Sequence, residues 1–301
     1  MAFSTLSIDW EDFGQLYGKY HYKDITEPVN GAIERQTDII LDLLDETGHK
    51  ATFFVLGILA KYRPGLVKKI AAKGHEIALH GQNHEAMFSL SPQAAQKDLE
   101  DSLKIVSDIT GDKIYGYRAP FFSVNETNLY VLEILAELGL TYDSSIFPIK
   151  MSRYGIEGFN QNDALYQLQN GMEIVELPLT ISQYVKKKWP VSGGGYIRLM
   201  PKFLVNKVFA DFKTNGKDSM IYMHPYEFDT NWINVSDNYP NDVTYSKIKV
   251  FALNLRWNLF RNSVREKIKS LLQQHQFKTC LEKANYVKSN GNSTKLLGCP
   301  K

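Results

Sequence analysis

Short apolar runs alternate with longer segments of helical periodicity along most of the chain. The runs are rich in branched and aromatic residues, as is typical of strands buried on both faces. They lie at residues 3–8, 51–56, 76–79, 114–117, 140–142, 174–179 and 219–223. The segments between them predict helices over 30–46, 60–73, 91–110, 125–138 and 201–212. This alternation predicts a parallel sheet with helices outside it, which at this length closes as a β/α barrel.

The remaining segments lack this alternation. Residues 14–28 are polar and aromatic and predict a loop, as do the glycines at 193–195. Residues 229–256 indicate an insertion or a loop that contains a hairpin, and 257–274 predict a final amphipathic helix with a basic face. Residues 285–301 are polar and rich in glycine and asparagine. We expect one domain over 1–284, with an insertion around 229–256 and a flexible tail over 285–301.

Composition narrows the function classes. The 301 residues suffice for one large α/β domain or two ordinary ones, and the net charge of +2 gives no argument for nucleic acid as a partner. The cysteines, Cys280 and Cys299, fit neither a disulfide framework nor a zinc knuckle. We expect no transmembrane segment, because the longest apolar run, 53–60, is too short. The N-terminus lacks the pattern of a signal peptide, so we expect a cytoplasmic protein.

Two histidines come directly after the predicted strand at 76–79. His80 and His84 are four residues apart, a spacing that places two imidazoles on one face of a helical turn. Such a pair can hold one metal ion, with zinc the usual candidate. Two unrelated polar residues in a loop would give the same pattern, so the pair alone does not decide.

Unusual polar residues also come after most of the other predicted strands, always at the carboxyl end. In a parallel β/α barrel these ends open on one face, where active sites form. Each residue has an ordinary structural explanation, such as a turn cap, a surface ion pair or a satisfied buried histidine. The joint occurrence of these polar residues favours an active site. The residues are Asp9, Glu11, His80, His84, Arg118, Asp143 and His224.

The chemistry that these residue types indicate is metal-assisted hydrolysis. Two histidines and one carboxylate bind a divalent ion and leave a position open for water. A second carboxylate can serve as base, and a further histidine can protonate a leaving amine. Arg118 can hold the base ionised, and Asp143 can favour the imidazolium form of His224.

Five motifs in this order resemble the polysaccharide deacetylase family, the carbohydrate esterases with NodB homology. The resemblance covers roughly residues 4–230 and implies a distorted (β/α)₇ TIM-like barrel. It also implies an enzyme that removes an acyl group, usually acetyl, from the nitrogen of an amino sugar. The motifs are Ser7-Ile-Asp9-Trp-Glu11-Asp12, His80-Gly-Gln-Asn-His84, Arg118-Ala-Pro120, Tyr142-Asp143-Ser-Ser and Met223-His224-Pro225.

Carried over by position, the resemblance implies roles for the catalytic residues. Asp9 becomes the catalytic base, oriented by Arg118, and His224 becomes the general acid, tuned by Asp143. His80 and His84 become metal ligands.

The third metal ligand departs from the commonest family pattern, which has two adjacent aspartates. Here Trp10 comes after Asp9, and strand alternation favours Glu11 as ligand, with Asp12 as the alternative. The expected ion is Zn²⁺, and Co²⁺, Ni²⁺ and Fe²⁺ also suit such a site.

The sequence looks most similar to a cytoplasmic branch of the family linked to exopolysaccharide or lipopolysaccharide assembly. We expect as substrate a glycan that contains amino sugars, or a nucleotide-linked or lipid-linked sugar. Arg198 or the basic last helix can meet a phosphate or anionic head groups, which allows peripheral membrane association. Two alternatives stay open: a deformylase or amidohydrolase acting on a non-polymeric substrate, and an inactive sugar-binding protein.

Overall fold

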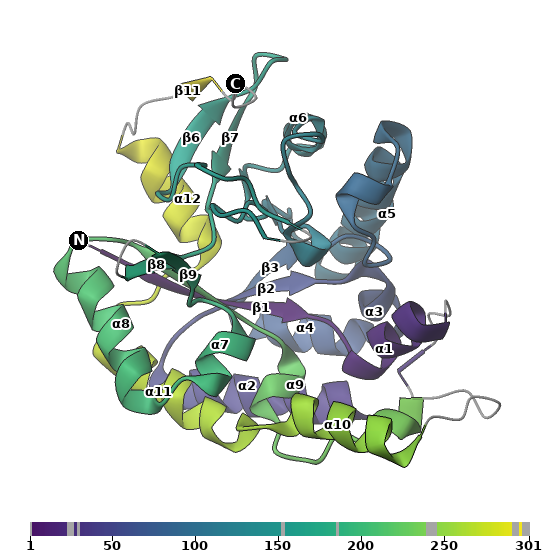
Figure 1. Ribbon diagram of the computed structural model, residues 1–301. Helices are drawn as coiled ribbons and strands as arrows, with labels where there is room; N and C mark the ends of the chain where they lie inside the picture. The colour runs from purple at the N-terminus through teal and green to yellow at the C-terminus, as the bar shows by residue number, and fades with distance from the viewer. Residues whose placement is uncertain are drawn as a thin grey trace.

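The computed structural model describes residues 2–22, 27–28, 31–151, 154–184, 187–238, 246–290 and 295–296. Its centre is a curled nine-stranded sheet (Figure 1). Seven neighbouring strands of this sheet run parallel, as predicted. In spatial order they are β10 (Ser219–Met223), β1 (Ser4–Trp10), β2 (Thr52–Val55), β3 (Glu76–Leu79), β4 (Gly116–Tyr117), β5 (Tyr142–Asp143) and β7 (Glu173–Glu176).

The sheet stays open instead of closing into a full ring. Beyond β7 lie β6 (Ala164–Gln167), antiparallel to β7, and β11 (Lys295–Leu296), so β10 and β11 form the two edges of the described sheet. The fold is therefore a half-barrel, the distorted form of the predicted (β/α)₇ architecture. A separate hairpin, β8 (Ile181–Tyr184) and β9 (Lys187–Pro190), was not predicted.

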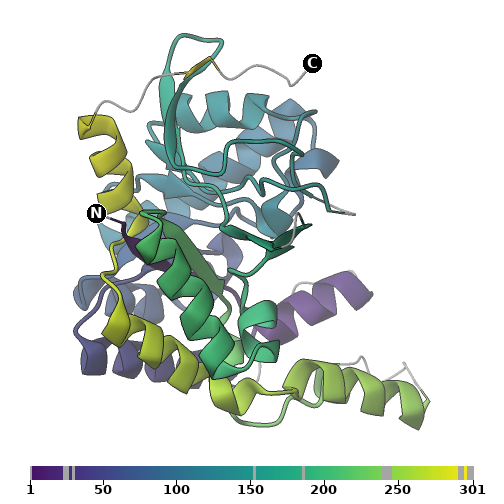
Figure 2. The same cartoon turned by 60° about the vertical axis from the view of Figure 1, so that its left-hand side comes forward.

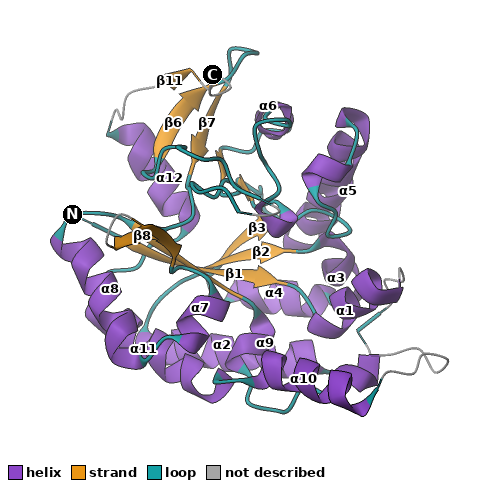
Figure 3. Cartoon of the chain, in the orientation of Figure 1, coloured by secondary structure: helices purple, strands orange, loops and turns teal. Residues whose placement is uncertain are grey.

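Helices cover the outside of this sheet (Figure 3). The longest is α5, and α2 is closed by Gly48, whose left-handed conformation (φ 69°) suits a residue without Cβ. The predicted helix over 60–73 is broken at Pro64 into two. The helices are α2 (Ala32–Thr47), α3 (Gly57–Tyr62), α4 (Pro64–Ala72), α5 (Pro92–Thr110), α6 (Tyr130–Glu137), α8 (Lys202–Thr214), α9 (Pro225–Phe228), α11 (Val264–Gln274) and α12 (Cys280–Ser289), with single 3₁₀ turns at Met87–Ser89, Pro120–Phe122, Val235–Asn238 and Arg261–Ser263.

Three predictions for the loops were wrong. The segment predicted as a loop at 14–28 contains α1 (Phe13–Tyr22), and the glycine loop at 193–195 begins α7 (Gly194–Leu199). The insertion around 229–256 contains α10 (Lys247–Asn258) and no described hairpin.

The C-terminal predictions were wrong in part. The final amphipathic helix starts only at Val264, because Phe260 has a positive φ of 59° that separates α10 from α11. The predicted tail is helical as far as Ser289, and beyond Asn290 the structure describes only residues 295–296. In the described part of the chain, no helix combines the length and the apolar character that crossing a bilayer requires.

Candidate active site

The polar residues predicted to converge lie together at the carboxyl ends of the parallel strands. Asp9 lies near the end of β1, Glu11 comes directly after that strand, and His224 comes after β10, the strand beside β1. His80 comes after β3 and Arg118 after β4, which is paired with β3. Because these strands are parallel neighbours, their carboxyl ends place side chains distant in sequence around one point.

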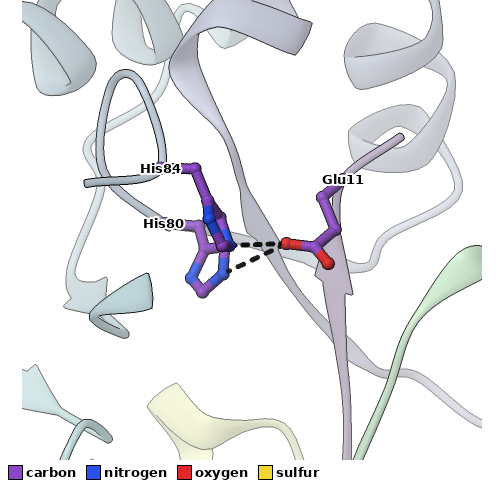
Figure 4. Close-up of side chains that lie close together, drawn as sticks. All are labelled: Glu11, His80 and His84. Atoms are coloured by element: carbon purple, nitrogen blue, oxygen red, sulfur yellow. Dashed lines mark ion pairs between the residues drawn. The ribbon is translucent and has the colours of Figure 1, made fainter. Parts of the chain in front are cut away.

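Glu11, His80 and His84 form a cluster in which one candidate ligand atom from each side chain lies within 4.8 Å of the other two. Oε2 of Glu11 is 2.8 Å from Nε2 of His84 and 3.7 Å from Nε2 of His80. Figure 4 shows both imidazole rings facing this single carboxylate oxygen from the opposite side. Both histidines are buried.

Hydrogen bonds to the other ring nitrogens fix the two imidazoles. Nδ1 of His80 lies 2.8 Å from the carbonyl oxygen of Arg118 and donates to it, which leaves Nε2 with a free lone pair. Nδ1 of His84 is 2.5 Å from the hydroxyl of Tyr20, which itself donates to the His84 carbonyl. The hydroxyl therefore accepts from Nδ1, and again Nε2 is left to bind.

This cluster fits a divalent metal ion. Oε2 of Glu11 is buried and has no hydrogen-bond partner in the described structure, as expected of an atom that awaits a cation. Burial opposes ionisation of Glu11, but the charge of the nearby His224 imidazole helps to hold its pKa below the ordinary value. Burial lowers the pKa of His84 and favours the neutral ring that a ligand needs. Two imidazoles and one carboxylate are a donor set that zinc accepts.

Asp12, the alternative ligand, has a different place. Its carboxylate accepts a hydrogen bond of 2.7 Å from the backbone N–H of Gln15 and so caps the first turn of α1. Burial raises its pKa. The metal-ligand geometry among the described residues therefore includes Glu11 and leaves out Asp12.

Asp9 and Arg118 form the expected buried ion pair. Nη1 of Arg118 is 2.6 Å from Oδ1 of Asp9 and also donates to the hydroxyl of Ser7 at 2.8 Å. The guanidinium stacks over the ring of Phe54, 4.1 Å from its centroid. Arg118 is fully buried and therefore fixes the orientation of the Asp9 carboxylate from below the site.

The carboxylate that holds His224 is Glu227, and the prediction that Asp143 does so was wrong. Oε2 of Glu227 lies 3.3 Å from Nδ1 of His224 and accepts from the His224 backbone N–H at 2.9 Å. Burial by itself would lower the pKa of His224. The charges of Glu11 and Glu227 outweigh this effect and raise the pKa to about 9. A protonated imidazole in this position can serve as a general acid.

Asp143 belongs to a buried carboxyl pair instead. It is directly opposite Glu176 in the register of β5 and β7, and both side chains are fully buried. Oδ1 of Asp143 accepts from the hydroxyl of Ser145, whose oxygen in turn accepts from the backbone N–H of Ala119. Asp143 thus supports the framework and has no described contact with His224.

An aromatic cavity of about 240 Å³ opens beside Glu11, His84 and His224. It was missed in the sequence because most of its wall comes from α1, which was predicted as loop, and because Trp257 was assigned to a separate final helix. Glu227 could have been found, since its spacing from His224 is that of a capping box. The other lining residues are Phe13, Leu16, Tyr17, Tyr20, His21, Phe121, Tyr226 and Trp257.

The predicted phosphate-binding role of Arg198 was wrong. Arg198 is buried and donates to the carbonyl oxygens of Trp257 and Arg256, at 2.9 and 3.2 Å. The basic face of the last helix is also engaged, because Lys267 is buried and donates to the carbonyl of Ile197. These cations fasten the C-terminal helices to the body.

Two family models match adjoining parts of the chain. Residues 27–142 match the polysaccharide deacetylase family, and residues 144–285 match a domain of unknown function, DUF3473.

Curated relatives share 30–32% identity with parts of this chain. The peptidoglycan deacetylase-like protein FGM2 of Gibberella zeae is 30% identical over 152 residues, 49% of this chain and 40% of that protein. PgdA, a peptidoglycan-N-acetylglucosamine deacetylase of Listeria monocytogenes, is 32% identical over 37% of this chain and 22% of its own length. A chitooligosaccharide deacetylase of Sinorhizobium fredii is 32% identical over 40% and 56%. The chain thus matches less than two thirds of each of these relatives.

Solved structures show the same fold over the whole chain. A protein assigned as a polysaccharide deacetylase from Mycobacterium smegmatis has a TM-score of 0.66 at 18% identity and covers 100% of this chain and 96% of its own. Puue allantoinase has a TM-score of 0.58 at 14% identity, over 97% and 91%. The motifs, the sheet topology and the family model agree that residues 27–142 carry a polysaccharide deacetylase domain.

Proposed function

We propose that the protein is a metal-dependent hydrolase that removes an N-acyl group, acetyl in the first instance, from an amino sugar in a glycan or glycan precursor. The observation that carries this proposal is the convergence of three groups of side chains at the carboxyl ends of the strands. They are the Glu11–His80–His84 cluster, the Asp9–Arg118 pair and the His224–Glu227 pair. Relatives named as peptidoglycan and chitooligosaccharide deacetylases support the choice of substrate class.

The chain's own residues divide the proton transfers of amide hydrolysis. When bound, a divalent ion, which we propose to be Zn²⁺, polarises the substrate carbonyl and acidifies water at the site. Asp9, held in place by Arg118, accepts a proton as water adds to the carbonyl carbon. His224 then donates its proton to the amide nitrogen, and the C–N bond breaks to give acetate and a free amine.

The cavity adds a reason for a sugar substrate. Its aromatic walls present apolar faces such as those against which pyranose rings pack, next to the reacting groups. A nucleotide-linked or lipid-linked sugar as the natural substrate, and a cytoplasmic location, stay predictions.

The test measures metal content and acetate release on the same preparations. Wild-type protein, stripped with a chelator and reloaded with Zn²⁺, should bind one ion per chain and release acetate from chitooligosaccharides. His80→Ala should lose the ion and the activity, whereas Asp9→Asn should keep the ion and lose activity. His49→Ala, a histidine away from the cluster, is the matched control and should keep both.

A second substrate panel separates this proposal from its alternative. Formylated amines and cyclic ureides, offered to the loaded protein, would be hydrolysed by an amidohydrolase of the same fold. Turnover of that panel without acetate release from any acetylated sugar would refute the deacetylase proposal. A protein that binds no metal and hydrolyses neither panel would favour the inactive sugar-binding alternative.

A further inference from the structure

An apolar stripe runs along α10 on the side away from the body. Ile248, Phe251 and Leu255 are 82%, 67% and 46% exposed, and their spacing of three and four residues puts them on one helix face. No residue of α10 is fully buried. Figure 2 shows the helix, in light green, extending at the lower right beyond the rest of the molecule. Large exposed apolar surface of this kind marks an interaction site.

The opposite face of α10 is firmly attached to the body. Trp257 packs edge-on against Phe13, with ring centroids 5.0 Å apart. The side chain of Asn254 accepts from the backbone N–H of Val235 at 2.8 Å, and Arg198 donates to the carbonyl of Trp257. The stripe is therefore held outward by these contacts.

Charge indicates what the stripe binds. The helix has three basic residues, Lys247, Lys249 and Arg256, and no acidic residue between Lys247 and Asn258. Helical spacing puts Lys247 along one edge of the stripe, and Lys249 and Arg256 along the other. An apolar face bordered on both sides by cations is the pattern of a helix that lies in the plane of an anionic membrane surface.

We propose that α10 is an interfacial anchor that docks the protein on membranes rich in anionic lipid, with Ile248, Phe251 and Leu255 in the acyl boundary and the flanking cations at the head groups. The binding needs no catalytic activity. Trp257 of the same helix lines the aromatic cavity beside Glu11, so docking brings the membrane surface next to that cavity. Only the further step, that the substrate reaches the site from the membrane, rests on the proposed function.

Vesicle sedimentation of the full chain tests the anchor without any enzymatic readout. Wild-type protein should co-sediment with vesicles of phosphatidylcholine and phosphatidylglycerol, and poorly with phosphatidylcholine alone. Ile248→Ser combined with Phe251→Ser should weaken binding at least about tenfold, since two large apolar groups no longer leave water. Lys247→Ala combined with Lys249→Ala should weaken it and reduce its salt dependence.

A matched control lies on α8. Phe203 is 73% exposed and adjoins Lys202, so Phe203→Ser removes a comparable apolar side chain elsewhere on the surface and should leave binding unchanged. Unfolding midpoints of all variants should agree with wild type, because the changed side chains support no core. Equal binding of the Ile248/Phe251 variant and wild type would overturn the proposal. So would a lipid-independent dimer that this variant dissolves, since the stripe would then bind a second copy.

Discussion

The buried carboxyl pair of Asp143 and Glu176 should make stability depend on pH. Burial, and next the charge of Asp143, raise the pKa of Glu176 well above its ordinary value. Oε2 of Glu176 has no hydrogen-bond donor in the described structure. We infer that this carboxyl carries a proton and donates a hydrogen bond to Asp143, which gives the buried oxygen a partner. In the unfolded chain the same carboxyl is ionised above about pH 5.

Proton uptake on folding sets the sign. A group whose folded pKa is raised contributes stability that is fully present below its unfolded pKa and is lost as pH rises through the folded pKa. One proton taken up on folding lowers the unfolding free energy by at most about 1.4 kcal/mol for each pH unit between the unfolded pKa, about 4.3, and the raised folded pKa. Glu176→Gln donates to Asp143 without titrating, and should remove this slope.

Urea unfolding from pH 5 to pH 8 measures the effect. Other titrating groups affect wild type and variant alike, so the difference between their slopes isolates the pair. Glu173→Gln, an exposed carboxyl on the same strand, is the control and should keep the wild-type slope. A Glu176→Gln protein whose stability changes with pH as steeply as wild type would refute this reasoning.

Three further changes test the site and its framework. Tyr20→Phe removes the hydroxyl that orients His84 and should weaken metal affinity about 10- to 100-fold in a chelator competition, whereas unchanged affinity would contradict the proposed tautomer. Arg118→Met leaves the Asp9 charge buried without a partner and should cost about 3–5 kcal/mol in urea unfolding; a loss under about 1 kcal/mol would count against the pair. Gly116→Ala should destabilise by about 1–3 kcal/mol or more, since its Cβ would lie 1.8 Å from the tyrosine ring on β5, and a neutral result in thermal unfolding would show that this ring can move.

The parts of the fold predicted correctly are those whose signal lies within one element. Strands such as β2 and β10 are buried throughout, so their sequences are continuous apolar runs. The carboxyl ends of parallel strands lie on the same side of the sheet. Polar residues that follow these strands could therefore be assigned to one site before any contact was known. The helices that pack against the sheet show apolar residues at helical spacing, and several of them are followed by a glycine.

The parts that failed depend on contacts between distant segments. Helix α1 was predicted as a loop because its tyrosines line the cavity, and the 3.6-residue core pattern is correspondingly weak. Asp143 was assigned to His224 because both come after strands, but only the pairing of β5 with β7 reveals that Glu176 lies opposite Asp143. The sequence shows which residues lie at the carboxyl ends of the strands. It does not show which carboxylate each of these residues contacts.

The site is assembled from both matched regions and from the segment before them. His80 and His84 lie within residues 27–142, Glu11 precedes that region, and His224 lies within 144–285. The pairing of β1 with β10 brings Glu11 within 3.5 Å of His224. The second region, whose family model carries no function, therefore supplies the candidate general acid, its Glu227 partner and the α10 wall of the cavity. Residues 144–285 therefore complete the candidate site of one half-barrel, because the described residues of the first region include none in the place of His224.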